Sequence, residues 1–455
     1  MKHKSINEDQ APVELLDMDA KKAGQDAYDL ATKLFPIARS ITGNGVRETL
    51  NILGHLLPNL TQHEVPTGTQ CFDWNIPKEW NIKDAYIVGP NGKRIIDFCN
   101  NNLHVVGYSV PVNINLTLDE LQPYLHSLPE QPDAIPYITS YYNEQWGFCL
   151  THHQREGLQD GTYHVVIDST LEQGHLTYGE LIIPGESNKE VFLSTYICHP
   201  SMGNNELSGP TVTTMLARWL KLQYKLRYTY RIIFIPETIG SIYYLSKNLK
   251  KMQKNTVAGF NISCIGDSRD YSYLPSKNGE TLADRIAQHV LDNHAPSYTK
   301  YSFLDRRSDE RQYCSVGVDL PVVTVARTLY WHYPEYHTSK DDLTVISPEG
   351  LGGGYMALRR CVECLEGNRT MKVTTPCEPQ LGKRGLYPTL SRGRGNTVYI
   401  LNELTAMDLL NMWAYSNGDD DLLEVADKIG VPMWNLLSAI EAFENEGLLS
   451  QVNND

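Results

Sequence analysis

The feature that most limits the possible folds is an alternation of strand-like and helix-like segments after about residue 162. The strand-like runs are apolar on both faces, and helix-like segments lie between them at 210–225 and 240–253. Strands of this kind are buried on both sides, so helices must cover both faces of their sheet. We therefore predict an α/β fold with a mostly parallel sheet, whose strands lie at 163–167, 179–183, 191–195, 231–235, 257–262 and 321–325.

The remaining sequence divides into parts of different character. Residues 20–57 show helical spacing, whereas 68–161 are rich in prolines, aromatic residues and short β-like runs. After a turn-rich stretch at 376–395, three helix-like segments with a tight turn before the third are typical of a winged helix. We predict a discontinuous α/β domain (1–66 and 162–370), an inserted β-rich domain (67–161) and a winged-helix-like domain (371–455).

Charge and hydropathy exclude several classes of partner. The formal net charge is −14, which disfavours a general binder of nucleic acids or anionic membranes. The third C-terminal helix carries Glu441, Glu444 and Glu446 and no arginine or lysine, so we expect packing or homo-oligomerisation there, not DNA binding. No apolar run approaches the about 18 to 20 residues that span a bilayer, and the polar N-terminus predicts a cytoplasmic protein.

The stretch 193–209 (LSTYICHPSMGNNELSG) has the form of a ligand site at a strand end. An apolar run leads to His199, a polar loop carries Asn204, Asn205 and Glu206, and a helix-like segment begins at Ser208. In doubly wound sheets, ligands bind at the carboxyl ends of strands. This stretch taken alone leaves two interpretations open: a metal site, or an ordinary strand–loop–helix corner with a surface histidine.

Other strand ends supply residues that could join His199. Glu237 follows the strand at 231–235, Asp267 follows the strand at 257–265, and His337 lies in a loop after the strand at 321–329. Each taken singly could be a helix cap, a turn residue or a surface histidine. Together, two histidines and carboxylates form a ligand mix that suits zinc, and Glu237 could act as the general base for a bound water.

This order of residues resembles the zinc aminopeptidases with a co-catalytic metal pair. Their Asn-Asp-Asp-x-Ser-Gly loop is matched by 204–209, and their final Tyr-His-Thr segment by 336–338. The chain is still more similar to a bacterial family of aminopeptidase-like proteins that carry the motifs found here at 198–201 (CHPS), 236–241 (PETIGS) and 308–313 (SDERQY). That resemblance implies an aminopeptidase (phosphorylase-like) α/β fold, an inserted small β-domain, a C-terminal winged helix and a link to polysaccharide biosynthesis.

Two positions depart from the pattern of the two-metal enzymes. Asn205 stands where those enzymes have a metal-bridging aspartate, and Thr238 stands where they have a second glutamate. Both changes favour one zinc ion over two. The metal ligands that we expect, partly from the residues and partly from the resemblance, are His199, Asp267, His337 and Asn205.

We therefore predict a zinc-dependent, aminopeptidase-like hydrolase of an amide or peptide bond, with Glu237 as general base. Its substrate would be a small peptide or an amide-bearing, sugar-linked molecule. The alternative is a catalytically inactive protein that keeps the fold for binding or assembly in polysaccharide biosynthesis. Expected substrate-binding residues are Arg307, Arg311, Asp309 and Tyr336, although Arg306, Arg307 and Arg311 could instead form structural ion pairs with Asp305, Asp309 and Glu310.

Overall fold

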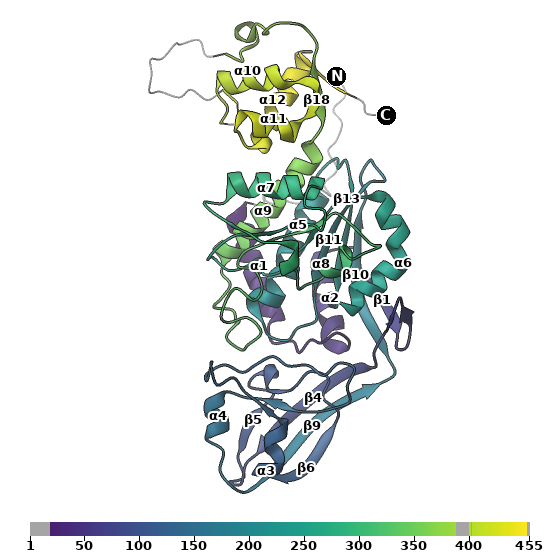
Figure 1. Cartoon of the computed structure of the whole chain (residues 1–455), viewed down its shortest axis with the longest axis vertical. Helices are drawn as coiled ribbons and strands as arrows, with labels where there is room; N and C mark the ends of the chain where they lie inside the picture. The colour runs from purple at the N-terminus through teal and green to yellow at the C-terminus, as the bar shows by residue number, and fades with distance from the viewer. Residues whose placement is uncertain (1–18, 388–399, 402, 453–455) are drawn as a thin grey trace, which may run out of the picture. The chain divides into compact units, whose positions relative to one another are not determined.

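The computed structural model describes residues 19–387, 400–401 and 403–452. The chain forms two compact units (Figure 1). The first comprises Met1–Ala283 with Thr299–Met356, and the second comprises Asp284–Tyr298 with Ala357–Asp455. The turn-rich linker expected at 376–395 lies partly outside the described residues. The limits that we expect for the three domains stay a prediction.

An eight-stranded sheet is the centre of the first unit, and its middle is parallel as predicted. The strands β12, β11, β13 and β16 run in parallel, whereas β1 is antiparallel to β10, β10 to β12 and β14 to β16. All seven residues of β11 are buried, as expected for a strand covered on both faces. In spatial order the strands are β1 (Thr61–Pro66), β10 (His175–Ile183), β12 (Thr229–Ile235), β11 (Glu190–Tyr196), β13 (Thr256–Asn261), β16 (Val322–Ala326), β14 (Ser272–Leu274) and β15 (Thr299–Lys300).

Helices cover both faces of this sheet. The helix α5 connects β11 to β12, and α6 connects β12 to β13 on the other side of β11. Because parallel crossovers are right-handed, connections that run in opposite directions along the sheet place their helices on opposite faces. Outside the inserted segment, the helices of this unit are α1 (Ala20–Leu34), α2 (Asn44–Leu56), α5 (Ser208–Leu222), α6 (Ile239–Asn255), α8 (Glu310–Tyr313) and the first part of α9 (Pro348–Gly367).

The inserted segment forms a smaller antiparallel sheet, in the order β5-β4-β9-β6. The strand at 163–167, predicted for the large sheet, belongs here: β9 (Thr162–Glu172) pairs with both β4 and β6. A five-residue apolar run does not show which sheet it joins, because pairing depends on distant partners. This inserted module contains β2 (Gln70–Cys71), β3 (Trp74–Asn75), β4 (Glu79–Val88), β5 (Arg94–Asp97), β6 (Val112–Thr117), α3 (Leu118–Leu121), β7 (Leu125–His126), β8 (Phe148–Cys149) and α4 (His152–Glu156).

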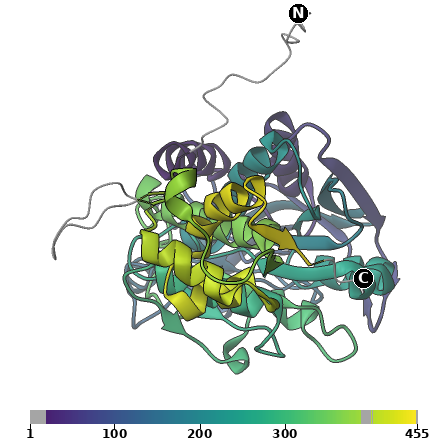
Figure 2. The ribbon, with the colours of Figure 1, turned by 90° about the horizontal axis from the view of Figure 1, so that it is seen from above.

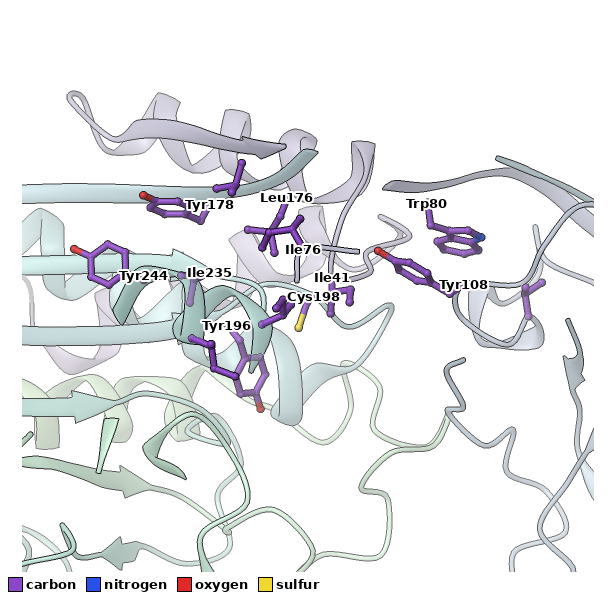
Figure 3. Packing of buried hydrophobic residues seen from close by; sticks show 14 of the residues in the cluster. Ile41, Ile76, Trp80, Tyr108, Leu176, Tyr178, Tyr196, Cys198, Ile235 and Tyr244 are labelled. Atoms are coloured by element: carbon purple, nitrogen blue, oxygen red, sulfur yellow. The ribbon is translucent and has the colours of Figure 1, made fainter. Parts of the chain in front are cut away.

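One apolar core runs through the eight-stranded and the four-stranded sheets of the first unit. Trp80 and Tyr108 stack with their ring centroids 5.8 Å apart at the module end of this core, and Ile235 and Tyr244 lie at its other end, with Cys198 between (Figure 3). Thr42, in the loop between α1 and α2, accepts a hydrogen bond from the amide of Trp80 at 3.0 Å. The module is therefore packed onto the α/β part and not tethered by a linker alone.

The second unit contains α10, α11 and α12, together with most of α7 and the last part of α9, and a three-stranded sheet in the order β18-β17-β19. The helices α11 and α12 are joined by a short turn at 430–432, and α12 leads to β19, as expected of a winged helix. Within this unit, Glu444 of α12 pairs with Arg369 at 2.8 Å. Figures 1 and 2 draw this part in green and yellow: β17 (Thr370–Val373), α10 (Ala406–Tyr415), β18 (Asn417–Asp421), α11 (Leu422–Ile429), α12 (Met433–Asn445) and β19 (Leu449–Gln451), with most of α7 (Leu282–His294) in the same unit.

Among the helices of the described residues, none has both the length and the apolar character needed to cross a bilayer.

Candidate functional site

His199 lies in the loop that follows β11 at the carboxyl end of the sheet, and only 4% of its surface is exposed. Its Nδ1 is 3.0 Å from Oε2 of Glu206, and its Nε2 is 3.8 Å from Oε2 of Glu237. Burial alone would lower the pKa of His199, but the two carboxylates outweigh burial and raise it. The imidazole is thus held between two carboxylates that approach different ring nitrogens.

A buried ion pair lies behind this histidine. Nε of Arg39 is 3.3 Å from Oε1 of Glu206, and neither side chain has exposed surface. Arg39 also donates from Nε to the carbonyl of His199 at 3.0 Å. Sequence reasoning missed the role of both residues; Glu206 was visible as an acidic residue in the His199 loop, but nothing in the sequence connects Arg39 to it.

Glu237 follows β12 directly and is presented by a strained turn. Thr238 has φ 64° and ψ −77°, and the amide of Ile239 donates to the carbonyl of Glu237 at 2.8 Å. These values describe a γ-turn with a positive central φ, a rare conformation that persists only where its surroundings hold it. Burial raises the pKa of Glu237, opposed by the positive charges of His199 and Arg311.

Asp309 is one of the groups that hold this turn. Its Oδ1 accepts hydrogen bonds from the amide of Thr238 at 2.8 Å and from Oγ of Ser241 at 2.7 Å. Burial and the charge of Glu237 raise the pKa of Asp309 to about 7. The side chain was expected to contact substrate, but it has no exposed surface and its position instead supports the turn that carries Glu237.

Asp267 also has its carboxylate occupied by protein donors. Its Oδ1 accepts from the amide of Arg269 and from Oγ1 of Thr328, each at 2.8 Å. Its Oδ2 accepts from the amide of Thr328 at 2.8 Å and from Nδ2 of Asn204 at 3.0 Å. Four donors on two oxygens leave little capacity for a metal ion, so in this structure Asp267 anchors the loop that begins at Thr328.

Asn205, at the position of the bridging aspartate, lies in the buried turn before α5. Its Oδ1 is 3.4 Å from the hydroxyl of Tyr196, and its Nδ2 is buried without a hydrogen-bond partner among the described residues. The amides of Asn204 and Asn205 donate to Asp341 at 2.7 and 2.9 Å. The turn is thus fixed by its backbone.

His337 completes the group of predicted residues that the structure brings near His199. The two imidazole centroids are 5.5 Å apart, and Tyr336 stacks on His337 at 4.0 Å. Burial, with the neighbouring charge of His199, lowers the pKa of His337 to about 3. His337 is therefore neutral at physiological pH, which is the form that ligates metals.

The inserted module forms one wall of the site, which sequence reasoning did not predict. The amide of Tyr137 donates to the carbonyl of His337 at 2.9 Å, and Ile135 and Ser339 exchange hydrogen bonds at 2.9 Å. The ring of Tyr137 lies 5.2 Å from both His199 and His337. Only proximity in the folded chain reveals this contact, because Tyr137 belongs to a loop of no distinctive sequence.

Ligand-type atoms of three or more residues lie within 4.8 Å of one another in two groups among the described residues: Cys198, His199 and Glu206, and Asp84, Asp97 and Cys99. The predicted set of His199, Asp267 and His337 is not one of these groups. The first group does not suit a metal thiolate. Burial, with the charge of Glu206, raises the pKa of Cys198 well above its usual range, and Arg39 already neutralises Glu206. In the second group, Arg94 contacts both carboxylates.

The arginines predicted to bind substrate are open to solvent. Arg307 and Arg311 are exposed, and within the described ranges neither forms an ion pair, so the alternative of structural pairs with Asp305, Asp309 or Glu310 is not realised. Nη2 of Arg311 donates to Oγ1 of Thr238 at 3.0 Å, which places this cation beside the Glu237 turn. The guanidinium of Arg307 lies 5.2 Å from the ring centroid of Trp331.

Comparison with known proteins gives matches over nearly the whole chain. Residues 28–368 match the model of a domain of unknown function, DUF4910, and residues 369–451 match a winged helix-turn-helix model. A protein of Clostridium acetobutylicum, named for polysaccharide biosynthesis and an aminopeptidase-like domain, is 45% identical over 435 residues, which are 95% of this chain and 98% of the relative.

Solved structures agree on the fold. A crystal structure described as a peptidase from Clostridium acetobutylicum matches with a TM-score of 0.88 and 43% identity, and the match covers 95% of this chain and 97% of that one. A zinc aminopeptidase from Bacillus subtilis matches with a TM-score of 0.55 and 13% identity, over 77% of this chain and 95% of that one. The predicted aminopeptidase-like α/β fold with a C-terminal winged helix is thereby confirmed.

Proposed function

This chain belongs to the DUF4910 family, and its Clostridium acetobutylicum relative is named for an aminopeptidase-like domain. From these likenesses we propose that the chain is a metal-dependent hydrolase of an amide bond. Its substrate would be a small peptide or an amide-bearing sugar derivative. The geometry around His199 is the observation that supports this proposal most directly.

The two nitrogens of His199 have different surroundings. Glu206 holds Nδ1 at 3.0 Å, and Arg39 fixes Glu206 in turn, whereas Nε2 is directed toward Glu237 at 3.8 Å. Metal-ligating histidines typically have one nitrogen oriented by a carboxylate, which leaves the other available to the ion. A histidine that only filled space would not need a buried ion pair behind it, since buried charges are costly.

The predicted ligands that remain available favour one zinc ion over two. His199 and His337 would hold it, and Asn205, Thr238 and the hydrogen-bonded Asp267 leave a second ion with few ligands. A bound zinc ion would polarise the substrate carbonyl and make water easier to deprotonate.

Glu237 is the residue best placed to move a proton. A carboxylate whose pKa is raised by burial takes a proton from attacking water more readily than an ordinary glutamate does, and can return it to the leaving amine. The γ-turn at Thr238, supported by Asp309, holds the carboxylate in place. Arg311 lies beside it and could balance the negative charge of a substrate.

A non-catalytic binding protein is the second candidate. It is favoured by the amide at Asn205, the loss of a glutamate at Thr238 and the occupied carboxylate of Asp267. The winged helix would then serve assembly. The two candidates differ in whether the site holds a metal and turns over an amide.

Metal content and turnover of the full chain test the proposal. Protein purified without chelator should carry about one zinc per chain. His199→Ala and His337→Ala should lose it, and His153→Ala, on the exposed helix α4, should retain it. Wild type should hydrolyse an aminoacyl anilide or an N-acetyl amino sugar, and Glu237→Gln should not. Absence of zinc from the wild type, or activity that survives Glu237→Gln, would reject this site.

A further inference from the structure

Trp331 is an exposed indole in the loop that leads to His337. Its exposed fraction is 61%, and its backbone has φ 65°, a left-handed conformation that is an outlier for a bulky side chain. Neither property helps the fold, since the ring buries little surface and the backbone is strained. Such outliers concentrate at ligand sites, where the surroundings hold them in place.

Two buried carboxylates hold the loop that carries Trp331. Asp267 accepts both the amide and the hydroxyl of Thr328 at the start of the loop. Glu310 accepts the hydroxyl of Tyr330, next to Trp331, at 2.6 Å. The loop is therefore anchored at Thr328 and at Tyr330, just before the point where it turns the indole outward.

The same carboxylate also positions a cation over this indole. Oε1 of Glu310 accepts the amide of Arg307 at 2.7 Å, and that amide lies 3.0 Å from the hydroxyl of Tyr330. The guanidinium of Arg307 lies 5.2 Å from the ring centroid of Trp331, within the range of a cation–π contact. Arg307 is exposed and forms no ion pair within the part of the chain that the structure describes, so its donors are available.

This pair is continuous with the site around His199. The ring of Trp331 lies 5.4 Å from Tyr336 and 6.4 Å from His337, and His337 lies 5.5 Å from His199. A ligand that covers the indole would thus reach the reacting region with its other end. Arg311 is a second exposed cation, and it lies beside the turn that carries Glu237.

We propose that Trp331 and Arg307 form a binding subsite for a pyranose ring that carries an anionic substituent, part of the substrate that reacts at Glu237. One face of a pyranose presents C–H groups that pack on a flat indole, while its hydroxyls and anionic group need polar partners at the edge of that ring. The guanidinium supplies paired donors for a carboxylate or phosphate. This subsite deepens the proposed function by naming its substrate class, and it rests on that function only for the bond that is cleaved.

An aromatic side chain of a peptide could also stack on an exposed indole. A neutral aromatic side chain would use Arg307 only through a cation–π contact, whereas an anion would also take the paired donors of the guanidinium. A sugar phosphate uses both groups at once, which is why the pair favours it over a peptide. The two ligands therefore make different predictions for variants of the two residues.

Calorimetric titration of the full chain separates these cases. The probes are N-acetylglucosamine 1-phosphate, N-acetylglucosamine, inorganic phosphate and N-acetylphenylalaninamide. We expect the sugar phosphate to bind about tenfold more tightly than the neutral sugar, as one good charge-assisted contact allows. Trp331→Ala should weaken both sugars about tenfold, and Trp331→Phe should restore most of that loss. Arg307→Ala should remove only the preference for the phosphate-bearing sugar. Trp74→Ala, at a partly exposed indole of the inserted module, should bind like wild type.

Four results would overturn the subsite. They are equal binding of sugar phosphate and inorganic phosphate, tighter binding of the phenylalanine amide, unchanged affinity of Trp331→Ala, and no binding of either sugar up to about 10 mM. Zinc content and turnover are not read in this titration. If this titration fails, the chain can still be a hydrolase with a peptide substrate. If the hydrolase proposal fails, the chain can still be a sugar-binding protein without activity.

Discussion

Arg39 and Glu206 form an ion pair with no exposed surface on either side chain, and the same carboxylate holds Nδ1 of His199. The pair connects the loop after α1 to the turn before α5. Burial lowers the pKa of Arg39, and the charge of Glu206 opposes that effect, so each ion depends on the other. The candidate site is thus built on a buried charge pair.

Removing one member of this pair should be costly. Arg39→Met leaves the Glu206 carboxylate buried and uncompensated, and should lower the free energy of unfolding by about 3 to 5 kcal/mol in urea denaturation. The double variant Arg39→Met/Glu206→Gln should recover part of that loss. Arg218→Met, at a partly exposed arginine of α5, should change stability by less than about 1 kcal/mol. A double variant no more stable than Arg39→Met would show that the charge of Glu206 is not the cause.

The pH dependence of activity should report the carboxyl group of Glu237. Because burial raises its pKa, kcat/KM for any amide that the protein cleaves should fall on acidification at a pH above the ordinary glutamate value. Arg311 lowers the pKa of Glu237, so Arg311→Met should move this acid limb to higher pH. A limb that moves to lower pH in Arg311→Met would exclude Glu237 as the titrating base. Arg218→Met serves as the control for a lost surface charge.

Stability at low pH should depend on His104 in the inserted module. This side chain is buried, its Nδ1 lies 2.7 Å from the carbonyl of Cys149, and burial lowers the pKa of His104. A histidine whose pKa is lower in the folded state stabilises the fold above its unfolded pKa of about 6.5, and that contribution is lost as pH falls through the folded value. His104→Gln should therefore show a smaller loss of unfolding free energy between neutral and acidic pH. His55→Gln, at an exposed histidine of α2, should keep the wild-type slope.

Two glycines near α2 offer a matched test of backbone conformation. Gly43 has φ 96°, and a Cβ added there would lie 2.2 Å from the carbonyl oxygen of Trp80. Gly43→Ala should lower the free energy of unfolding by about 2 to 3 kcal/mol and loosen the contact between the α1–α2 loop and the module. Gly54 lies within α2 with open space around it, so Gly54→Ala should stabilise by about 0.5 to 1 kcal/mol. Thermal unfolding of both variants checks the two signs.

The large sheet could be predicted because its strands are apolar on both faces, which indicates that both faces are buried. The run at 191–195 is apolar on both faces, and β11 is buried throughout. The rule that ligands bind at strand ends predicted that Glu237 lies near His199. In the structure, Oε2 of Glu237 is 3.8 Å from Nε2 of His199. The same rule also selected Asp267, but a carboxylate at a strand end does not reveal how many donors will saturate it.

Contacts between distant segments could not be read from the sequence. Arg39 pairs with Glu206, and Tyr137 meets His337, only because the folded backbone brings those segments together. The apolar run at 163–167 joined the smaller sheet because its partners are β4 and β6, which a local pattern does not identify. Periodicity records which faces are buried, not which neighbour buries them.

The inserted module is fastened to the His337 loop by backbone hydrogen bonds at Tyr137 and at Ile135, and the hydroxyl of Ser339 accepts one more bond from the amide of Ile135. Hydrogen bonds between two main-chain groups form whatever side chains the two residues carry. Side chains on this wall can therefore change during evolution while the loop keeps its place. We expect an exchange of inserts between two members of the family to transfer only the part of the substrate preference that this wall sets, while the part set by Trp331 and Arg307 stays with the α/β domain.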